Sequence, residues 1–320
     1  GSGSSSNSTT SDPDEYSYDA QGNRTNSGYV TGTGNQTLSD GELSYAYDAK
    51  GNRVSETVIS TGETWTYEYD LLNHLTAVEH RSSAGGTLIG RVEYTYDVFG
   101  NRLSRTEYDG DSTIISAEHF SYDMWKTADQ TQVVGNEYSD VWADLNSSNS
   151  LVTRRIYGNT ADSLLARVSA NQSVAWYLTD RQGTVIGLTD QNGQVQDTLT
   201  YDGFGHTTSE TNATFGDRYK YAGREYDSAG GGIYFLRDRV LSQDLTQFLT
   251  PDRMGFAAGD SNLYRYVGNG FTNGTDPSGF ARFGEELINI GRYLISDPLD
   301  VPVQWISGLY EGGKGLLIGA

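Results

Sequence analysis

The chain has 320 residues, of which 36% are hydrophobic, 23 are Tyr and 39 are Gly, and its formal net charge is -20 at pH 7. Tyr favours strands and Gly favours turns, so this composition predicts an all-β protein made of many short strands. The negative charge disfavours nucleic-acid binding through the overall field. Because the sequence has no Cys and its four His lack the spacing of a zinc site, we expect neither a metal nor a cofactor.

The first 14 residues are a polar, Ser-rich stretch, for which we expect a disordered linker. No apolar run approaches the roughly 20 residues that a membrane-spanning helix needs, so no membrane span is expected.

Internal repetition dominates residues 16–125. Five segments share an aromatic-x-Tyr-Asp core, and their Asp residues lie 22 to 29 residues apart. The segments are YSYDAQGNR (16–24), YAYDAKGNR (45–53), YEYDLLNHL (67–75), YTYDVFGNR (94–102) and FSYDMW (120–125). A further unit, TYDGFGH, occupies 200–206, and residues 176–195 have a related hairpin pattern. Such repetition is typical of architectures in which each unit packs against its neighbours.

Each repeat predicts a β-hairpin. In Tyr-x-Tyr the two rings fall on one face of a strand, because side chains alternate along it. Asp then takes the first position of a type I turn, where its carboxylate accepts a backbone N–H, and Gly three residues later supplies a positive φ. A single hairpin is only marginally stable. The units are therefore expected to pair into one continuous antiparallel sheet that carries rows of aromatic rings.

The sequence between 126 and 175 keeps strand character without the Tyr-Asp signature. After Phe280 the residue pattern of the chain changes. Beyond that residue, Phe283, Leu287, Ile290 and Leu294 recur at helical spacing, which predicts a short amphipathic helix. We therefore place a boundary at 280 and expect a separate C-terminal segment over 281–320. This segment is short for a complete effector, so we expect a truncated effector, a leader peptide or a plug.

The repeats resemble those of Rhs and tyrosine/aspartate (YD) repeat proteins, including the C components of insecticidal toxin complexes and the teneurins. The stretch from Tyr201 to Phe280 resembles the Rhs-associated core of the bacterial members. Its matching pieces are YKYAGREYD (219–227), GIYFLRDRV (232–240), TQFLTPDRMGF (246–256), NLYRYVGNG (262–270) and TDPSGF (275–280). The resemblance implies a repeat region over 15–200, a core over 201–280, and a sheet that spirals into a hollow shell.

In that family the segment beyond the core is a variable effector, often a toxin, which is held inside the shell. The chain is cut at the last core motif. Carried over to this sequence, the resemblance implies cleavage between Phe280 and Ala281. Asp276 then lies in the cleavage motif, and Asp252 matches the upstream acidic residue.

The sequence departs from the family pattern at three places. Arg253 follows Asp252 where Pro is usual, and Phe280 precedes the cut where Leu is usual. Gly270-Phe271 replaces the common Asn-Pro.

A pair of close carboxylates suits this cleavage. Two carboxylates forced together cannot both ionise, so one holds a proton while the other acts as a base toward water. Asp252 and Asp276 form such a pair if the intervening hairpin brings them together. Arg253 and Arg265 are candidates to orient them through charge-assisted hydrogen bonds.

The same residues also fit a purely structural role. Asp276 is suited to begin a tight turn with Pro277 and Gly279 at its later positions, Asp252 is suited to cap another turn, and the two Arg are suited to the surface.

Two further interpretations compete for the repeats themselves. Asp-x-x-Gly-Asn resembles a calcium ligand pattern, yet the EF-hand and β-roll patterns are absent, and a turn role accounts for both Asp and Gly. Aromatic side chains beside acidic residues also suit glycan binding in a non-catalytic adhesion module. The candidate Trp residues are Trp65, Trp125, Trp142 and Trp176. Adhesion predicts aromatic rows that face solvent, whereas encapsulation predicts rows that line or stabilise a wall.

The resemblance thus implies an Rhs-type β-shell that encapsulates or presents a C-terminal polypeptide and cuts itself after Phe280. No motif of an enzyme acting on an external substrate occurs, so catalysis is expected only on the chain itself.

Expected partners are its own C-terminal segment, other YD-repeat chains or a capping protein, and, in the adhesive alternative, a cell-surface glycan. The expected location is secreted or at the cell surface of a bacterium. Since the repeats are few for a closed shell, we expect a fragment of a longer protein, a miniature shell, or a subunit whose sheet edges a partner covers.

Overall fold

The computed structural model describes residues 16–123, 139–158 and 162–280. These residues form two antiparallel sheets, one of sixteen strands and one of four. The helices in the described ranges are four short 3-10 segments: η1 (Thr33–Asn35), η3 (Tyr221–Gly223), η4 (Gly255–Ala258) and η5 (Val267–Asn269). The prediction of an all-β protein is therefore confirmed. The predicted helix at 283–294 lies outside the described residues.

The strands of the large sheet pair in chain order, each antiparallel to the next. Its first half comprises β1 (Tyr29–Thr31), β2 (Thr37–Asp40), β3 (Leu43–Tyr47), β4 (Arg53–Val58), β5 (Thr64–Tyr69), β6 (Leu75–Arg81), β7 (Leu88–Tyr96), β8 (Arg102–Asp109) and β9 (Ile114–Asp123). Its second half comprises β10 (Asp140–Asn146), β11 (Leu151–Tyr157), β12 (Leu164–Ser169), β13 (Val174–Thr179), β14 (Val185–Asp190), β15 (Val195–Tyr201) and β16 (Thr207–Glu210). Residue 201, the expected start of the core, is thus the last residue of β15.

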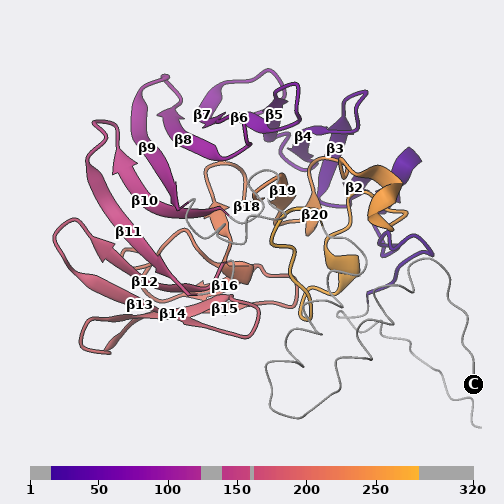
Figure 1. Ribbon diagram of the computed structural model, residues 1–320. Coiled ribbons are helices and arrows are strands. Elements are labelled where there is room, and N and C mark those ends of the chain that lie inside the picture. Colours follow the sequence, from indigo (N-terminus) through magenta and orange to yellow (C-terminus); the bar gives the residue numbers. More distant parts are fainter. Residues whose placement is uncertain (1–15, 124–138, 159–161, 281–320) are drawn as a thin grey trace, which may run out of the picture.

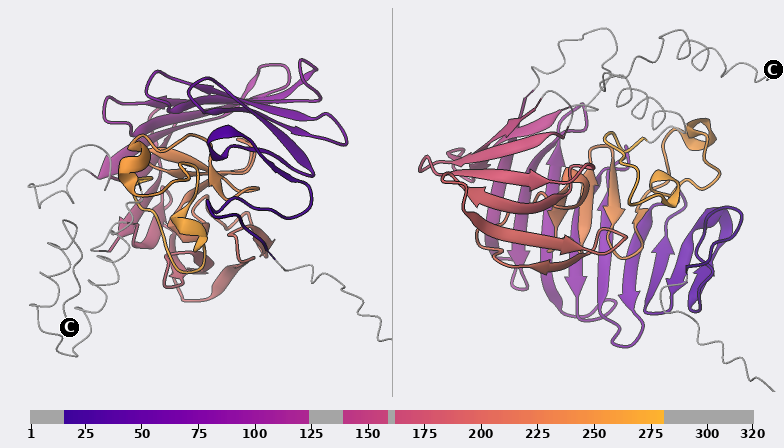
Figure 2. Two further views of the ribbon diagram at one scale, coloured as in Figure 1. Left: turned by 90° about the vertical axis from the view of Figure 1, so that its right-hand side faces the viewer. Right: turned by 90° about the horizontal axis from the view of Figure 1, so that it is seen from below.

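The large sheet curls around the end of the described chain. Figure 1 shows β2 to β9 arching over the top and β10 to β16 turning round the left side and below. The small sheet comprises β17 (Glu225–Asp227), β18 (Ile233–Leu236), β19 (Arg239–Ser242) and β20 (Gln247–Phe248). It lies on the concave side, between the two halves of the large sheet (Figure 2). The antiparallel sheet predicted from the repeats and the curl implied by the resemblance are both confirmed, and the chain's own core segment lies on the concave side.

The Tyr-Asp turns have the predicted geometry. In the second repeat, Gly51 has φ +90° and its N–H bonds to the Asp48 carbonyl at 3.0 Å. The Asp48 carboxylate Oδ1 accepts the N–H groups of Lys50 at 2.8 Å and Asn52 at 2.9 Å. The same pair of carboxylate bonds recurs at Asp19, Asp70, Asp97, Asp109, Asp180, Asp190 and Asp202. These carboxylates therefore serve their own turns, which accounts for the repeated Asp without calcium.

From the second repeat onward the aromatic rows face inward, whereas Tyr16 and Tyr18 of the first repeat are 46% and 38% exposed. Tyr45, Tyr67 and Tyr94 are 6%, 4% and 2% exposed. Tyr67 and Tyr94 pack with residues of β18 and β19, among them Phe235 and Val240. Such rows stabilise a wall, as the encapsulation interpretation expects, rather than facing solvent.

The small sheet is buried on both faces, which explains the continuous apolar run of β18. Ile233 and Phe235 pack against β5 to β7 of the large sheet. Tyr234 and Leu236, on the opposite face, pack with Tyr266 and other residues of the core segment. Because successive side chains point to opposite faces, all four β18 side chains are buried.

The hairpin turns converge on the segment that ends at Phe280. The hydroxyl of Tyr264 donates to the Gly51 carbonyl at 2.7 Å, and the Asn269 amide donates to the Gly22 carbonyl at 2.9 Å. From the far half of the sheet, the Gln182 amide donates to the carbonyl of Phe271 at 3.0 Å. The repeats therefore act as a frame that fixes this segment from several sides.

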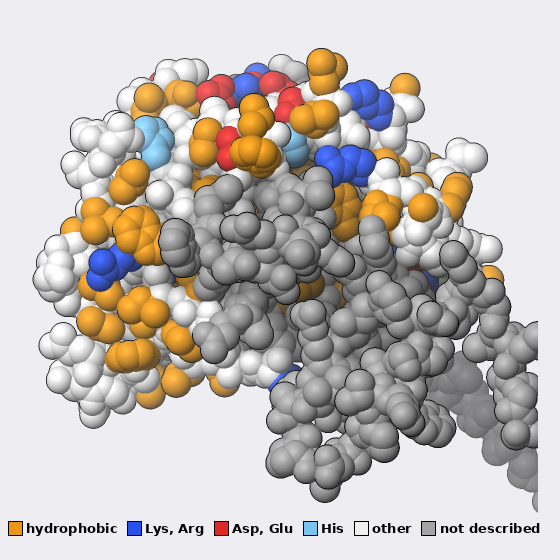
Figure 3. All heavy atoms as spheres, viewed as in Figure 1, with side chains coloured by type: hydrophobic (Ala, Val, Ile, Leu, Met, Phe, Trp, Pro, Cys, Tyr) orange, Lys and Arg blue, Asp and Glu red, His pale blue; other side chains and the backbone are white. Residues whose placement is uncertain are grey.

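Hydrophobic side chains also gather on the surface over the hairpins β11 to β14, at the lower left of Figure 3. Trp142, Ile156, Leu165, Trp176, Leu178 and Ile186 are between 41% and 47% exposed. Of the other two Trp residues considered for glycan binding, Trp65 stacks on His80 with ring centroids 4.2 Å apart, and Trp125 lies outside the described residues.

Candidate functional site

Asp252 and Asp276 meet at one guanidinium group. Nη2 of Arg239 lies 3.1 Å from Oδ2 of Asp252 and 3.6 Å from Oδ2 of Asp276. The two Asp residues are 7% and 2% exposed. Each uses its other oxygen, Oδ1, in a local turn: Asp252 accepts the N–H of Met254 at 2.8 Å, and Asp276 accepts that of Gly279 at 2.9 Å. The turn role and the proximity of the carboxylates therefore coexist.

A two-residue turn between β18 and β19 binds the end of the described chain. Leu236 pairs with Arg239 across this hairpin, so the turn consists of Arg237 and Asp238. Three consecutive residues of the turn hold three consecutive carbonyls. Arg237 Nη1 donates to the carbonyl of Pro277, and Arg239 Nε donates to the carbonyl of residue 279. Between them, the Asp238 N–H donates to the carbonyl of residue 278 at 3.3 Å. The chain before Phe280 thus lies against this turn in a bent conformation, with three successive carbonyls held in order.

Gly279 fits this turn closely. Its φ is +77°, a conformation that favours glycine. A Cβ at this position would lie 2.4 Å from the Leu236 carbonyl oxygen and 2.9 Å from the Arg239 nitrogen. Only a residue without a side chain can lie this close to the β18–β19 turn.

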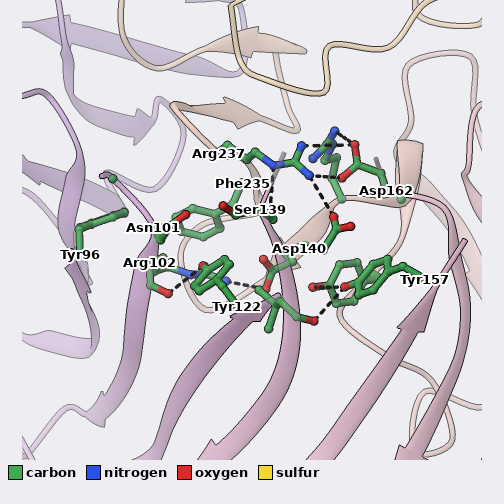
Figure 4. A pocket seen from close by; sticks show the side chains of 16 residues that line it. Tyr96, Asn101, Arg102, Tyr122, Ser139, Asp140, Tyr157, Asp162, Phe235 and Arg237 are labelled. Atoms are coloured by element: carbon green, nitrogen blue, oxygen red, sulfur yellow. Dashed lines mark hydrogen bonds and ion pairs between the residues drawn. The ribbon is translucent and has the colours of Figure 1, made fainter. Parts of the chain in front are cut away.

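Arg237 connects the turn to the wall of the shell. Its Nη2 bonds to Asp140 at 3.0 Å and to Asp162 at 2.7 Å, and its Nε donates to the Ser139 carbonyl at 3.1 Å. Figure 4 shows these groups converging on Arg237 beside a small cavity. Burial opposes the charge, but Asp162 and Asp140 outweigh it and raise the pKa of Arg237. The end of the described chain is therefore fixed to β10 through one side chain.

Burial and nearby charges shift the pKa values of Asp238 and Arg239 in opposite directions. Burial lowers the pKa of Arg239, against the opposing effect of Asp252 and Asp276. The guanidinium carbon of Arg239 lies 3.5 Å from the centroid of the Phe248 ring, which fixes its plane. Burial raises the pKa of Asp238 to about 6, although Arg253 and Arg239 favour its charged form.

The partners predicted for two arginines need correction. Arg253 pairs with Asp238 at 2.6 Å, and Arg265 pairs with Asp260 at 2.8 Å. Arg253 directly follows Asp252 in a turn and its side chain is 54% exposed, so it points out of the buried site. Arg265 is held by an acidic residue of its own loop. The guanidinium that lies between the two carboxylates belongs instead to Arg239.

The two residues at which the sequence departs from the family pattern around the cut contact each other. The guanidinium carbon of Arg253 lies 4.7 Å from the centroid of the Phe280 ring, and Phe280 is half-buried. Ala281, the predicted residue after the cut, lies outside the described residues.

Sequence reasoning missed the three turn residues Arg237, Asp238 and Arg239. The available signal was the RDR triplet inside the apolar run GIYFLRDRV, where three adjacent charges interrupt a buried hairpin. Buried charges require partners, so this triplet pointed to a paired polar site.

A second cluster of charges lies deeper in the shell. A cavity of about 450 Å³ is lined by arginines and carboxylates from β8 to β12 and from residues 216–228. Arg155 pairs there with Asp144 at 2.6 Å and with Asp217 at 3.0 Å, and Arg218 pairs with Asp144 at 2.6 Å. Each arginine has a carboxylate partner, so this network holds the wall to the core segment.

In the described part of the chain, no three His, Asp or Glu side chains are grouped in a way that would hold a metal ion. Within the same ranges, none of the helices has the length and apolar character needed to cross a membrane.

Comparison with known proteins identifies the family. Residues 4–270 match the family model described as Teneurin YD-shell. The chain belongs to the YD-shell family. The match spans the repeats and most of the core segment of this YD-shell chain.

Two curated bacterial relatives resemble this YD-shell chain. The tRNA3(Ser)-specific nuclease WapA of Bacillus spizizenii is 28% identical over 283 residues, which is 83% of this chain and 11% of that protein. The tRNA nuclease WapA of Bacillus subtilis is 29% identical over 283 residues, with the same coverage of 83% and 11%. The chain thus spans about a tenth of the length of these relatives.

Solved structures of Tc toxin components are also similar. The Tc holotoxin pore of Photorhabdus luminescens, with a variant of TccC3, matches with a TM-score of 0.44 and 16% identity, over 83% of this chain and 16% of that one. The TcdB2–TccC3 complex matches with a TM-score of 0.31 and 15% identity, over 82% of this chain and 21% of that one.

Proposed function

We propose that this YD-shell chain holds a C-terminal polypeptide and cuts itself once, between Phe280 and Ala281, with Asp252 and Asp276 as its acid–base pair. The observation that carries the proposal is the turn at Arg237 to Arg239. It binds three successive carbonyls of the motif, and its last residue contacts both carboxylates.

Folding itself presents the bond. A cleavage within one chain needs no binding step, because positioning of the reacting groups is already provided by the fold. The carbonyls of residues 277, 278 and 279 are held in order, and Gly279 is too tightly packed to move freely. The next peptide bond, which follows Phe280, is therefore presented close to Asp252 and Asp276.

The chemistry needs one acid and one base. Water adds to the carbonyl carbon of Phe280 while one carboxylate takes a proton from that water. The other carboxylic acid donates a proton to the nitrogen of Ala281, and the C–N bond breaks. The products are a carboxyl terminus at Phe280 and an amino terminus at Ala281, and no other reactant is needed.

Arg239 balances the charge of this pair. With both carboxylates ionised, the three groups together carry one negative charge in a buried site. The proposed mechanism requires that the pair hold one proton, so that one group acts as the acid and the other as the base.

Encapsulation is supported by the curled sheet and its inward aromatic rows. The core segment lies on the concave side of the sheet (Figure 2). Since the chain spans about 11% of its curated relatives, we infer that a full-length protein builds a larger shell around its effector. The names of those relatives make a tRNA nuclease one class of effector for such a protein.

We infer a secreted or cell-surface location in a bacterium, with the C-terminal segment, further YD-repeat chains or a capping protein as partners. The adhesive alternative has less support, because Tyr45, Tyr67 and Tyr94 of the rows are buried. Exposed aromatic side chains among the described residues include Tyr16, Trp142 and Trp176.

The test is the intact mass of the purified chain beside Asp252→Asn and Asp276→Asn variants. We expect a fragment that ends at Phe280 in the wild type and one whole chain in both variants. Asp260→Asn is the matched control, since it removes an Asp–Arg pair of similar geometry in the same region. A wild-type chain that stays whole after folding would overturn self-cleavage, and cutting in the Asn variants would exclude the pair as its catalyst.

A further inference from the structure

A cation covers the residue before the proposed cut. The guanidinium carbon of Arg253 lies 4.7 Å from the centroid of the Phe280 ring, within the distance at which a cation and an aromatic face attract. The Phe280 side chain is half-buried, and its N–H donates to Ser278 Oγ at 3.1 Å. Ring and backbone of this residue are therefore both held.

Arg253 is itself fixed, although its side chain is 54% exposed. An exposed Arg normally samples many rotamers, and holding it in one of them has an entropic cost. Here Asp238, whose side chain is 9% exposed, holds Nη2 of Arg253 at 2.6 Å. Because burial raises the pKa of Asp238 only to about 6, Asp238 is ionised at pH 7 and attracts the cation.

Asp238 connects this cation to the backbone of the motif. Its N–H donates to the carbonyl of Ser278 at 3.3 Å, while its carboxylate holds Arg253. One buried residue thus aligns the main chain before the cut and the side chain that covers Phe280. The neighbouring Arg239 contacts the two carboxylates of the proposed acid–base pair.

We propose that Asp238 and Arg253 form a clamp on the ring of Phe280, which makes the site selective for an aromatic residue before the cut. This inference rests on cleavage after Phe280, as proposed above. Arg253 is a positioning residue in this scheme, because it contacts the side chain next to the bond and not the reacting atoms. An aliphatic residue has no π face, so a clamp of this kind discriminates against it.

A double-mutant cycle tests the clamp on the self-cleavage rate, measured by mass after dilution from denaturant. In the chain with Phe280, Arg253→Met should slow cleavage by roughly three- to tenfold. In the Phe280→Leu chain, Arg253→Met should have no effect. In the chain with Phe280, Arg253→Lys should keep part of the rate that Arg253→Met loses. Equal slowing in both backgrounds would overturn the clamp, since a merely structural Arg253 acts whatever the neighbouring residue is.

Chymotrypsin, which cuts after aromatic residues, gives a second readout that does not depend on self-cleavage. In the Asp252→Asn chain, or in the wild type if it stays whole, the clamp should protect Phe280. Arg253→Met should then speed chymotryptic cutting after Phe280 severalfold, relative to other sites. The control is Arg154→Met on the exposed face of β11.

The two measurements separate the two proposals. A wild type that does not cut itself, with Phe280 protected by Arg253, removes the proposed function and leaves the clamp as a structural contact. A wild type that cuts itself, with no coupling between Arg253 and Phe280 and no protection, overturns the clamp and leaves the proposed function intact.

Discussion

The hydroxyl of Tyr96 donates a 2.7 Å hydrogen bond to the main-chain carbonyl of Leu75, the first residue of β6. Leu75 pairs with Tyr69 of β5, but the pairing of β6 with β7 begins only at Ala77. On the β7 side the Tyr96 hydroxyl therefore takes the place of a strand partner for the Leu75 carbonyl. The same bond joins Tyr69 to the Arg53 carbonyl at 2.7 Å and Tyr122 to the Arg102 carbonyl at 2.9 Å. The Tyr of these three Tyr-Asp pairs therefore connects consecutive hairpins.

Replacing Tyr96 with Phe should keep the packing and remove only this bond. We expect a loss of about 1–3 kcal/mol in the free energy of unfolding, because a carbonyl loses its partner. Urea unfolding followed by circular dichroism measures it. Tyr16→Phe is the control, since the Tyr16 ring is 46% exposed and contacts Phe204, a contact that Phe retains. Equal stability of Tyr96→Phe and the wild type would show that the hydroxyl has no role in joining the hairpins.

Gly279→Ala should disturb the candidate site through the backbone. The new Cβ would collide with the Leu236 carbonyl and with a main-chain nitrogen of β19, and the positive φ would add strain. Gly34→Ala is a matched control, because Gly34 has φ +69° but no atom within 4 Å of the added Cβ. We expect the control to lose about 1–2 kcal/mol from the left-handed conformation. Gly279→Ala should lose roughly 1–3 kcal/mol more from overpacking.

Thermal unfolding of both variants, together with the fraction of cut chain, measures these effects. If the two Ala variants were equally stable and equally cut, the close fit of Gly279 against the β18–β19 turn would have no consequence.

Local chemistry accounts for the part of the fold that the sequence predicts. The Asp at the start of each turn and the Gly three residues later act within one hairpin, so Asp48 and Gly51 identify a turn without knowledge of the rest of the chain. Alternation along a strand likewise predicts that the rings of Tyr45 and Tyr47 share a face. These regularities extend over the whole sheet because it pairs in chain order.

The contacts of the candidate site are not local, and residue patterns alone did not predict them. Arg239 reaches Asp252 and Asp276 only because the core segment folds back on the β18–β19 turn. Arg253 adjoins Asp252 in sequence, yet the turn directs its side chain toward Asp238. Sequence neighbours of a carboxylate are thus poor guides to its charge partner when backbone direction changes at every turn.

The free energy of unfolding should rise and then fall as pH increases. Burial raises the pKa of Glu56 to about 7 and that of Asp238 to about 6, so both bind a proton more tightly in the folded chain. Their contribution is complete below the unfolded values of 4.5 and 3.8, and it is lost as pH rises from these to the folded values. Asp144 and Asp217 act in the opposite sense, because nearby Arg residues outweigh burial and lower their pKa values. Stability should therefore be greatest near pH 4, where Asp144 and Asp217 are ionised and Glu56 and Asp238 still hold their protons.

Asp217 offers the sharpest test of the loss of stability at low pH. Burial disfavours its charge, but Arg155, Arg218 and Arg167 outweigh burial and keep the pKa of Asp217 below its usual value. Its contribution is therefore present above the unfolded value of 3.8 and is lost as pH falls through the lower folded value. Asp217→Asn should cost roughly 3–5 kcal/mol at pH 7, because Arg155 and its neighbours keep their charges without this partner.

The measurement is the urea midpoint between pH 7 and pH 2.5 for Asp217→Asn, the wild type and Asp111→Asn, which alters an exposed turn between β8 and β9. We expect the wild type and the Asp111 variant to lose stability steeply below pH 4. The Asp217 variant should start lower and fall less, so that the curves converge in acid. Parallel curves would mean that Asp217 contributes through packing alone, since only a group that titrates differently in the folded and unfolded chains changes the slope.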